Sequence, residues 1–313
     1  MAVRPALKIE RELLRHLGRP VPLRLMRQVL IEWAWIVGAI LMAVHVGQAW
    51  ATVPAILFIG TRQHALLTLM HEFAHRQFSR TRPAWNDSLG DVFTALPFLI
   101  TIHGYRRDHF QHHRATSTAL DPNWTSSLRR ARYRFPRSRA GMAWLLLLHL
   151  LGVYAIQDIK AYLFDAKMSV DTPRATQLRQ AVFALLVVGA ASVLDGWAVI
   201  GLYWFVPMFT SLMALLYLRD VGEHHAMPRP GLEASRTTLT GWFEGFFIAP
   251  NAVGFHAEHH LYPAVPFCRL RELHGLLRQQ PGHADHAVLT HGYCRGLLTE
   301  VAQSPSLSGI DQA

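Results

Sequence analysis

Long apolar runs alternate with short polar turns over most of the chain. A helix needs about 20 predominantly apolar residues to cross a bilayer, and the pattern predicts spanning helices over residues 29–50, 51–70, 181–194 and 197–218. Two weaker runs are interpreted as a re-entrant or interfacial segment (92–102) and an interfacial helix (142–156). We expect residues 1–28 to form a basic cytosolic leader with a short amphipathic helix. Residues 278–313 are expected to form a short C-terminal tail.

These elements predict a single domain over residues 1–313. The expected fold class is all-α integral membrane, with four transmembrane helices in two hairpins, interfacial helices and a cytosolic helical cap. No internal repeat or low-complexity linker divides the chain.

Composition agrees with a membrane protein. Hydrophobic residues make up 51% of the 313 residues and charged residues only 17%, while the net charge is +10. The basic residues flank apolar runs and do not interleave with aromatic ones, which favours a basic cytoplasmic face over a nucleic-acid partner. The two cysteines, Cys268 and Cys294, form no CxxC motif and no disulfide framework.

Histidines gather in four clusters, which read HEFAH, HFQHH, DVGEHH and FHAEHHLYPAVP. Residues three or four apart share one face of a helix, so the imidazoles of a cluster can point at one spot. Imidazole suits iron, zinc, copper and nickel. The candidate ligands are His71, His75, His109, His112, His113, His224, His256, His259 and His260. They are too many for one metal ion and suit two.

The predicted spans must place all four histidine clusters on one side of the membrane if these clusters share one metal site. Clusters that share one site must lie on the same side of the membrane, so the number of crossings between His113 and His256 must be even. Two spans satisfy this condition, and the arginine-rich stretch 129–139 then lies in the cytoplasm, as positive-inside topology requires. We expect the active site and both termini to be cytoplasmic.

Three other kinds of metal protein fit the sequence less well. HEFAH alone is the HExxH signature of a zinc metalloprotease, but its distant aspartate candidate, Asp195, falls on the outer side and the other clusters stay unexplained. A membrane metal carrier would place its ligands near the bilayer midplane. A carboxylate-bridged di-iron bundle needs paired Glu-x-x-His motifs, and only Glu72–His75 fits.

HEFAH, HFQHH with Asp121-Pro122 downstream, and HAEHHLYPAVP followed by Leu270 and His274 resemble the three histidine boxes of the membrane fatty acid desaturase family. The likeness covers roughly residues 63–277. It implies a four-span, mushroom-like fold with a cytosolic di-iron centre, all nine histidines as ligands and O2 as co-substrate. Asp220 stands where some relatives carry an asparagine near the metal and is a candidate to act through water. His225 is expected beside the ligands or at the surface.

The function expected is oxygen-dependent oxidation of an unactivated C–H bond in a lipid, foremost desaturation of a fatty-acyl chain. The alternative is a hydroxylase of a lipid, alkane or other apolar metabolite, because rebound of oxygen gives an alcohol. Among nearby acidic residues, we expect Glu72, Glu223, Glu258 and Asp108 to orient imidazoles. His64 lies seven residues before His71 on the same helical face and is a candidate to line the substrate path.

Expected partners are a lipid or fatty-acyl substrate, surrounding membrane lipids and a separate electron donor. The stretch after Leu277 is too short for a haem or flavin module, and two cysteines cannot hold an iron–sulfur cluster. A ferredoxin, rubredoxin or haem protein with its reductase would supply electrons, and an acidic donor suits the basic face. We expect a multi-pass integral membrane protein of the bacterial inner membrane.

Overall fold

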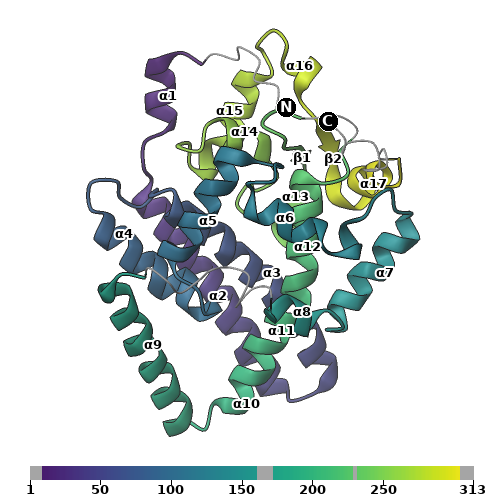
Figure 1. Cartoon of the computed structure of the whole chain (residues 1–313). Coiled ribbons are helices and arrows are strands. Elements are labelled where there is room, and N and C mark those ends of the chain that lie inside the picture. Colours follow the sequence, from purple (N-terminus) through teal and green to yellow (C-terminus); the bar gives the residue numbers. More distant parts are fainter. Residues whose placement is uncertain (1–8, 161–171, 228–230, 304–313) are drawn as a thin grey trace. The chain divides into compact units, whose positions relative to one another are not determined.

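The structure, a computed structural model, describes residues 9–160, 172–227 and 231–303 (Figure 1). Its described residues are mainly helical. The chain divides into two compact units, each assembled from separate stretches of sequence. The first unit comprises Met1–Arg19, His109–Leu147 and Leu216–Ala313, and the second comprises Pro20–Asp108 and Leu148–Leu215.

Four helical stretches of the described residues are long and apolar enough to cross a membrane, which confirms the predicted number. The first contains α1 (Arg11–Leu17) and α2 (Pro22–Val46), the second is α3 (Ala49–Ala74), and the third is α9 (Arg174–Val193). The fourth consists of α10 (Trp197–Ile200), η5 (Gly201–Phe205), α11 (Val206–Phe209) and α12 (Ser211–His224).

The boundaries of the first two spans differ from the predicted ones for local backbone reasons. Pro22 starts α2 because its fixed φ suits the first helical position and its missing N–H costs nothing there. Gly47 ends α2 in the left-handed region, with φ of 65°, so Trp50 belongs to the next helix. Helix α3 continues to Ala74 and carries His71.

The fourth span was predicted as one helix and is interrupted twice. Residues Gly201–Phe205 form a π-helical turn, and Thr210 leaves the helical region with φ of −124° and ψ of −89°. Pro207 lacks the backbone N–H that a regular helix would use and therefore favours a break.

The two weaker apolar runs form only short helices. After α4 (Pro83–Gly90) come η1 (Asp91–Ala95) and η2 (Leu96–Phe98), which Leu99 ends with φ of 63°. The second run forms α7 (Arg139–Leu150) and α8 (Ala155–Lys160) on either side of Gly152, whose φ is 71°. Neither belongs to the four membrane-length stretches.

The remaining elements complete the described chain. The helices are α5 (Ile102–Ala115), α6 (Pro122–Leu128), η3 (Ala131–Tyr133), α13 (Trp242–Phe247), α14 (His256–Leu261), η6 (Phe267–Arg269), α15 (Leu270–Leu277), α16 (His283–His286), η7 (Gly292–Leu297) and α17 (Leu298–Gln303). Strands β1 (Thr237–Leu239) and β2 (Leu289–His291) pair in parallel, with Thr237 opposite Leu289. The predicted C-terminal tail is therefore structured through residue 303; residues 304–313 and residues 1–8 of the leader lie outside the described part.

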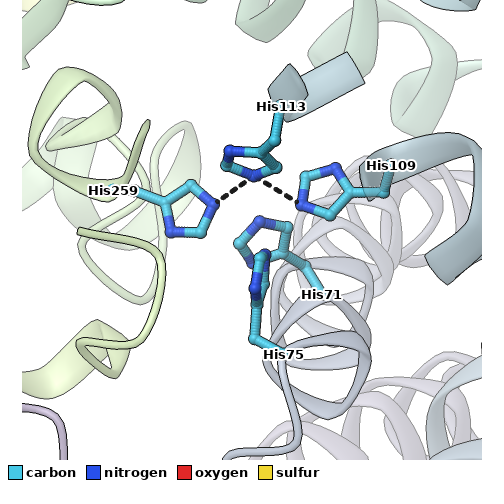
Figure 2. Close-up of side chains that lie close together, drawn as sticks. All are labelled: His71, His75, His109, His113 and His259. Carbon is cyan, nitrogen blue, oxygen red and sulfur yellow. Dashed lines mark hydrogen bonds between the residues drawn. The ribbon is translucent and has the colours of Figure 1, made fainter. Parts of the chain in front are cut away.

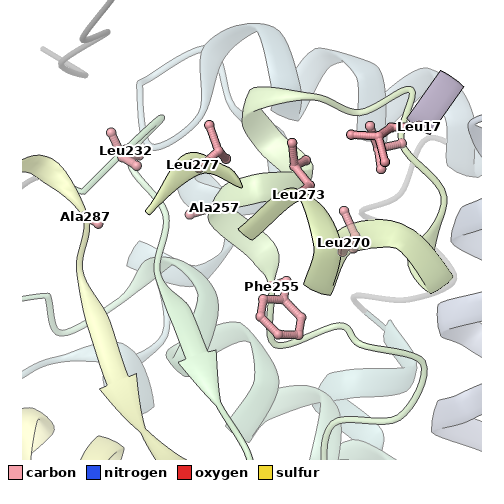
Figure 3. Packing of buried hydrophobic residues seen from close by; sticks show 9 residues of the cluster. Leu17, Leu232, Phe255, Ala257, Leu270, Leu273, Leu277 and Ala287 are labelled. Carbon is pink, nitrogen blue, oxygen red and sulfur yellow. The ribbon is translucent and has the colours of Figure 1, made fainter. Parts of the chain in front are cut away.

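A buried apolar cluster in the first unit holds α14 and α15 together (Figure 3). Its members are Leu17, Leu232, Phe255, Ala257, Val265, Leu270, Leu273, Leu277 and Ala287. Arg269 also ties this cluster to the N-terminal segment, because its guanidinium donates hydrogen bonds to the carbonyls of His16 and Leu17 at 2.7 and 2.9 Å. The helix that carries the last histidine cluster is thus fixed by a dry core.

The second unit packs its helices closely at small residues. A Cβ added at Gly60 on α3 would lie 2.7 Å from the Cβ of Ser211 on α12. The indoles of Trp33 and Trp204 stack with ring centroids 5.3 Å apart. Arg62 of α3 is buried and pairs with Glu32 at 3.2 Å. Its charge is therefore neutralised inside the protein.

Candidate metal centre

Four buried imidazoles of the first unit converge on one point. We name His112, His224, His256 and His260 the four-histidine group; each offers a ring nitrogen, and these atoms lie within 4.8 Å of one another. The Nε2 atoms of His256 and His224 are 2.8 Å apart, and those of His260 and His256 are 3.1 Å apart. The rings come from α5, α12 and α14, so a tertiary fold is needed to assemble them.

The outer nitrogen of every ring in this group faces an oxygen. The Nδ1 contacts are His112 with Asp121 Oδ2 at 2.8 Å, His224 with the Ala234 carbonyl at 3.1 Å, His256 with Glu223 Oε1 at 3.2 Å and His260 with Thr116 Oγ1 at 3.3 Å. Thr116 donates its own hydroxyl proton to the His112 carbonyl at 2.9 Å, so its oxygen can accept. Glu223 Oε1 also accepts from Arg219 Nε at 2.6 Å.

Acceptors at all four Nδ1 atoms place the ring proton there and leave each Nε2 with a lone pair. Four lone pairs directed at one point repel one another unless a cation lies among them. Neighbouring nitrogens bound to one metal at about 2.1 Å lie roughly 3 Å apart, which matches the Nε2 separations of 2.8 and 3.1 Å. The donor set therefore fits a transition-metal ion.

Ionisation of the histidines agrees with this assignment. Burial lowers the pKa of His260 well below its ordinary value, and the neighbouring His256 lowers it further. The pKa of Asp121 is lowered overall, because the hydrogen bond from His112 and the other attractive contacts outweigh the effect of burial, which alone would raise it. Histidine binds metals as the neutral imidazole, which is the form that a lowered pKa favours.

A second set in the first unit consists of His109, His113 and His259, which we name the three-histidine group. The Nε2 of His113 lies 2.9 Å from that of His109 and 3.0 Å from that of His259, as the dashed lines in Figure 2 mark. Burial lowers the pKa of His113 to about 3, with His112 contributing. This ring is also held as a neutral base.

The two groups divide the predicted boxes. His109 and His113 are four residues apart and fall in one group, while His112 falls in the other. His256 and His260 likewise share a group without His259. The expectation that all imidazoles of one box point at one spot is therefore wrong, because a spacing of four gives a tighter common face than a spacing of three.

His71 and His75 belong to the second unit and are also drawn in Figure 2. Their ring centroids are 4.7 Å apart at the end of α3, and Glu72 Oε1 lies 3.5 Å from His71 Nδ1. Arg106 fixes this helix end, since its Nε donates to the Ala74 carbonyl at 2.7 Å and its Nη2 to the Phe73 carbonyl at 3.1 Å.

Other predicted residues lie elsewhere. Asp220 Oδ2 is 3.8 Å from His225 Nε2, outside both groups. His225 is buried against Trp124, with ring centroids 4.8 Å apart, and is not a surface residue. Asp108 pairs with Arg107 at 2.9 Å. His64 is fully buried on α3, and its predicted role in lining the substrate path stays a prediction.

Sequence reasoning missed two carboxylate contacts. Asp121 accepts from His112, and it also caps α6 by accepting from Asn123 N at 2.9 Å. An aspartate before a proline is an N-cap signal that could have fixed its position. Glu258 was expected to orient a ligand, but its Oε1 lies 2.6 Å from Nδ1 of His274, which is not among the nine candidate ligands.

Membrane-length helices together with convergent imidazole groups define a class of histidine-rich helical membrane proteins. The sequence profile described as fatty acid desaturase matches residues 48–291, and the chain belongs to this family. It is therefore a membrane protein and an oxidoreductase, as the resemblance implied.

Curated relatives include three desaturases. The chain is 25% identical over 297 residues to dihydrorhizobitoxine desaturase of Bradyrhizobium elkanii, covering 90% of this chain and 84% of the relative. It is 26% identical to the sn-1 oleoyl-lipid 12-desaturase of Arthrospira platensis (82% and 80% covered). The sphingolipid delta(4)-desaturase of Drosophila melanogaster is also 26% identical (79% and 75% covered).

Proposed function

We propose that the protein introduces a double bond into a fatty-acyl chain, with O2 as co-substrate and two iron ions held by its nine clustered histidines. The observation that carries this proposal is the four-histidine group, whose outer nitrogens all face acceptors and whose inner nitrogens converge. Two relatives named for lipid desaturation support the acyl substrate.

The ligands divide by their groups. The four-histidine group would hold one iron and the three-histidine group the other, and His71 and His75 are the further candidate ligands that the HEFAH box supplies. Support for adding this pair comes from the HEFAH box, where a spacing of four residues puts both rings on one face of α3. Iron, when bound, supplies the oxidising chemistry with O2 that removes hydrogen from an unactivated C–H bond.

The protein's own residues prepare this chemistry. Asp121, Ala234, Glu223 and Thr116 fix the ring orientation and keep each Nε2 unprotonated. Burial of the groups keeps bulk water away from the reacting atoms. The apolar spans offer a medium in which an acyl chain is soluble.

The overall reaction balances with an external reductant. Two hydrogen atoms leave the substrate, O2 is reduced to two water molecules, and a separate donor supplies two electrons while two protons come from solvent. We propose a ferredoxin, rubredoxin or haem protein with its reductase as that donor. The arginine-rich stretch 129–139 supports a cytoplasmic position for the site, in a bacterial inner membrane.

The test is a comparison of lipid profiles in a host that expresses the protein or one of two variants. His112→Ala removes a buried member of the four-histidine group, while His103→Ala makes the same change in a half-buried residue of α5 outside both groups. We expect a new alkene with the original protein and with His103→Ala, and none with His112→Ala.

Other products would overturn parts of the proposal. A new alcohol in place of the alkene would show hydroxylation. Desaturation of a small metabolite with unchanged lipids would refute the acyl substrate. Small metabolites should therefore be measured too, because one relative is named dihydrorhizobitoxine desaturase. Purified protein with clearly fewer than two irons per chain after reconstitution would refute the di-iron assignment.

A further inference from the structure

A third set of buried ligand-type side chains lies outside both histidine groups. Glu258, His274 and His283 each offer one ligand atom, and these atoms lie within 4.8 Å of one another. All three side chains belong to the first unit and are buried, with residues 1%, 6% and 2% exposed. None of the nine candidate iron ligands is among them.

Contacts within this set leave donor atoms unused. Glu258 Oε1 lies 2.6 Å from His274 Nδ1, and Glu258 Oε2 accepts from Thr237 Oγ1 at 2.7 Å. The Nε2 atoms of His274 and His283 are buried and have no hydrogen-bond partner among the described residues. A buried polar atom without a partner is costly, so each of these two nitrogens indicates a missing partner.

The surrounding fold holds these residues firmly. Glu258 is on α14 and His274 on α15, the two helices joined by the apolar cluster of Figure 3. The ring of Phe255 packs against His274 with centroids 5.2 Å apart. His283 opens α16 directly after Gly282, whose φ of 80° favours glycine and turns the chain at this point.

We infer that Glu258, His274 and His283 form a separate site for one Zn²⁺ ion, which ties α14, α15 and α16 together. Two imidazoles and one carboxylate are a recognised zinc donor set, with water in the fourth position. Mixed nitrogen and oxygen ligands also favour Zn²⁺ over Fe²⁺ in intrinsic affinity. The site would brace the helix that carries His256, His259 and His260 without contacting substrate.

The test counts metals in the full-length protein purified in detergent. Protein reconstituted with iron is given one equivalent of Zn²⁺ and freed of unbound metal by gel filtration, and zinc and iron per chain are measured by mass spectrometry. We expect His283→Ala to lose one metal equivalent as zinc and to keep its iron. His286→Ala, a change in a histidine of the same helix outside the set, should match the original protein.

A second variant distinguishes the loss of a zinc ligand from unfolding of the protein. His283→Cys replaces one ligand with another, so it should keep the zinc and, loaded with Co²⁺, show a thiolate-to-cobalt charge-transfer band that the original protein lacks. The inference is overturned if His283→Ala keeps the original zinc content. It is equally overturned if the cysteine variant elutes as folded protein but binds no cobalt through sulfur. The zinc count does not depend on desaturase activity, so the two proposals can fail separately.

Discussion

At the scale of single residues, the hydrogen bonds at Nδ1 of each imidazole decide whether its Nε2 keeps the lone pair that binds a metal. Asp121 holds the His112 proton on Nδ1 at 2.8 Å and accepts from the backbone N–H of Ser117 at 2.9 Å. Carboxylates in this position raise ligand basicity, and their loss typically costs 10–100-fold in metal affinity or activity.

Asp121→Asn should therefore weaken iron binding about 10–100-fold while the fold survives, because asparagine is also a good N-cap for α6. The measurement is iron affinity by competition with a chelator. Asp108→Asn is the matched control, since Asp108 pairs with the partly exposed Arg107 and belongs to neither histidine group. Equal affinity in Asp121→Asn and the control would contradict this role.

Asp87 makes stability depend on pH. Burial alone would raise the pKa of its carboxyl, but hydrogen bonds from Arg106 and Asn86 lower it below the ordinary value. Because the folded pKa is below the unfolded one, near 3.9, the stabilisation is complete above that value and is lost as pH falls through the folded pKa.

The difference in unfolding free energy between the original protein and Asp87→Asn should therefore be constant near pH 6–7 and shrink below about pH 4. Thermal unfolding in detergent across this range measures it. A difference that grows on acidification would contradict the assignment of Asp87 as the ionised partner of Arg106.

At the scale of elements, helix contacts in the second unit depend on the absence of a side chain. A Cβ at Gly60 would meet Ser211 and come within 2.9 Å of the Leu212 N, whereas one at Gly38 on α2 would meet nothing within 4 Å. Overpacking costs typically 1–3 kcal/mol, while glycine to alanine in an open helix gains about 0.5–1 kcal/mol.

Gly60→Ala should thus lower stability by about 1–3 kcal/mol, and Gly38→Ala should leave it equal or slightly higher. Thermal midpoints of both variants in the same detergent provide the comparison. If Gly60→Ala proved as stable as Gly38→Ala, α3 and α12 would not pack as closely as described.

The helices that span the membrane were the features that the sequence predicted best. Apolar runs predicted four spans because hydrophobicity over about 20 residues is a strong signal, but their ends were set by Pro22 and Gly47, single residues whose backbone preferences act locally. The interruption at Thr210 and the pairing of β1 with β2 arise from tertiary packing, which no short window of sequence contains.

At the scale of the whole molecule, the nine candidate ligands were predictable as residue types and only partly as groups. Spacing explains why His109 joins His113 and why His256 joins His260. That His112 and His224 meet His256 depends on how distant segments fold together. The contact of Asp121 with His112 and the set of Glu258, His274 and His283 were missed for the same reason.

Removing the metals should loosen the helices that carry the candidate ligands. A ligand at 100 times its dissociation constant stabilises the folded state by about 2.7 kcal/mol, so chelation of a metal bound at that ratio should cost about that much. Hydrogen exchange should rise in α5 and α14, while α9, in the second unit, stays unchanged. Equal exchange in α14 with and without metal would contradict metal-linked folding.

The interleaved order of the two units also bears on how the protein is made. The ribosome delivers His112 long before His224 and His256, and at 5–20 residues per second the delay to His256 is about 7–30 seconds. During that interval the nascent HFQHH segment presents imidazoles without their eventual neighbours. A metal ion held by the four-histidine group can therefore find its full set of ligands only after His224, His256 and His260 have been synthesised.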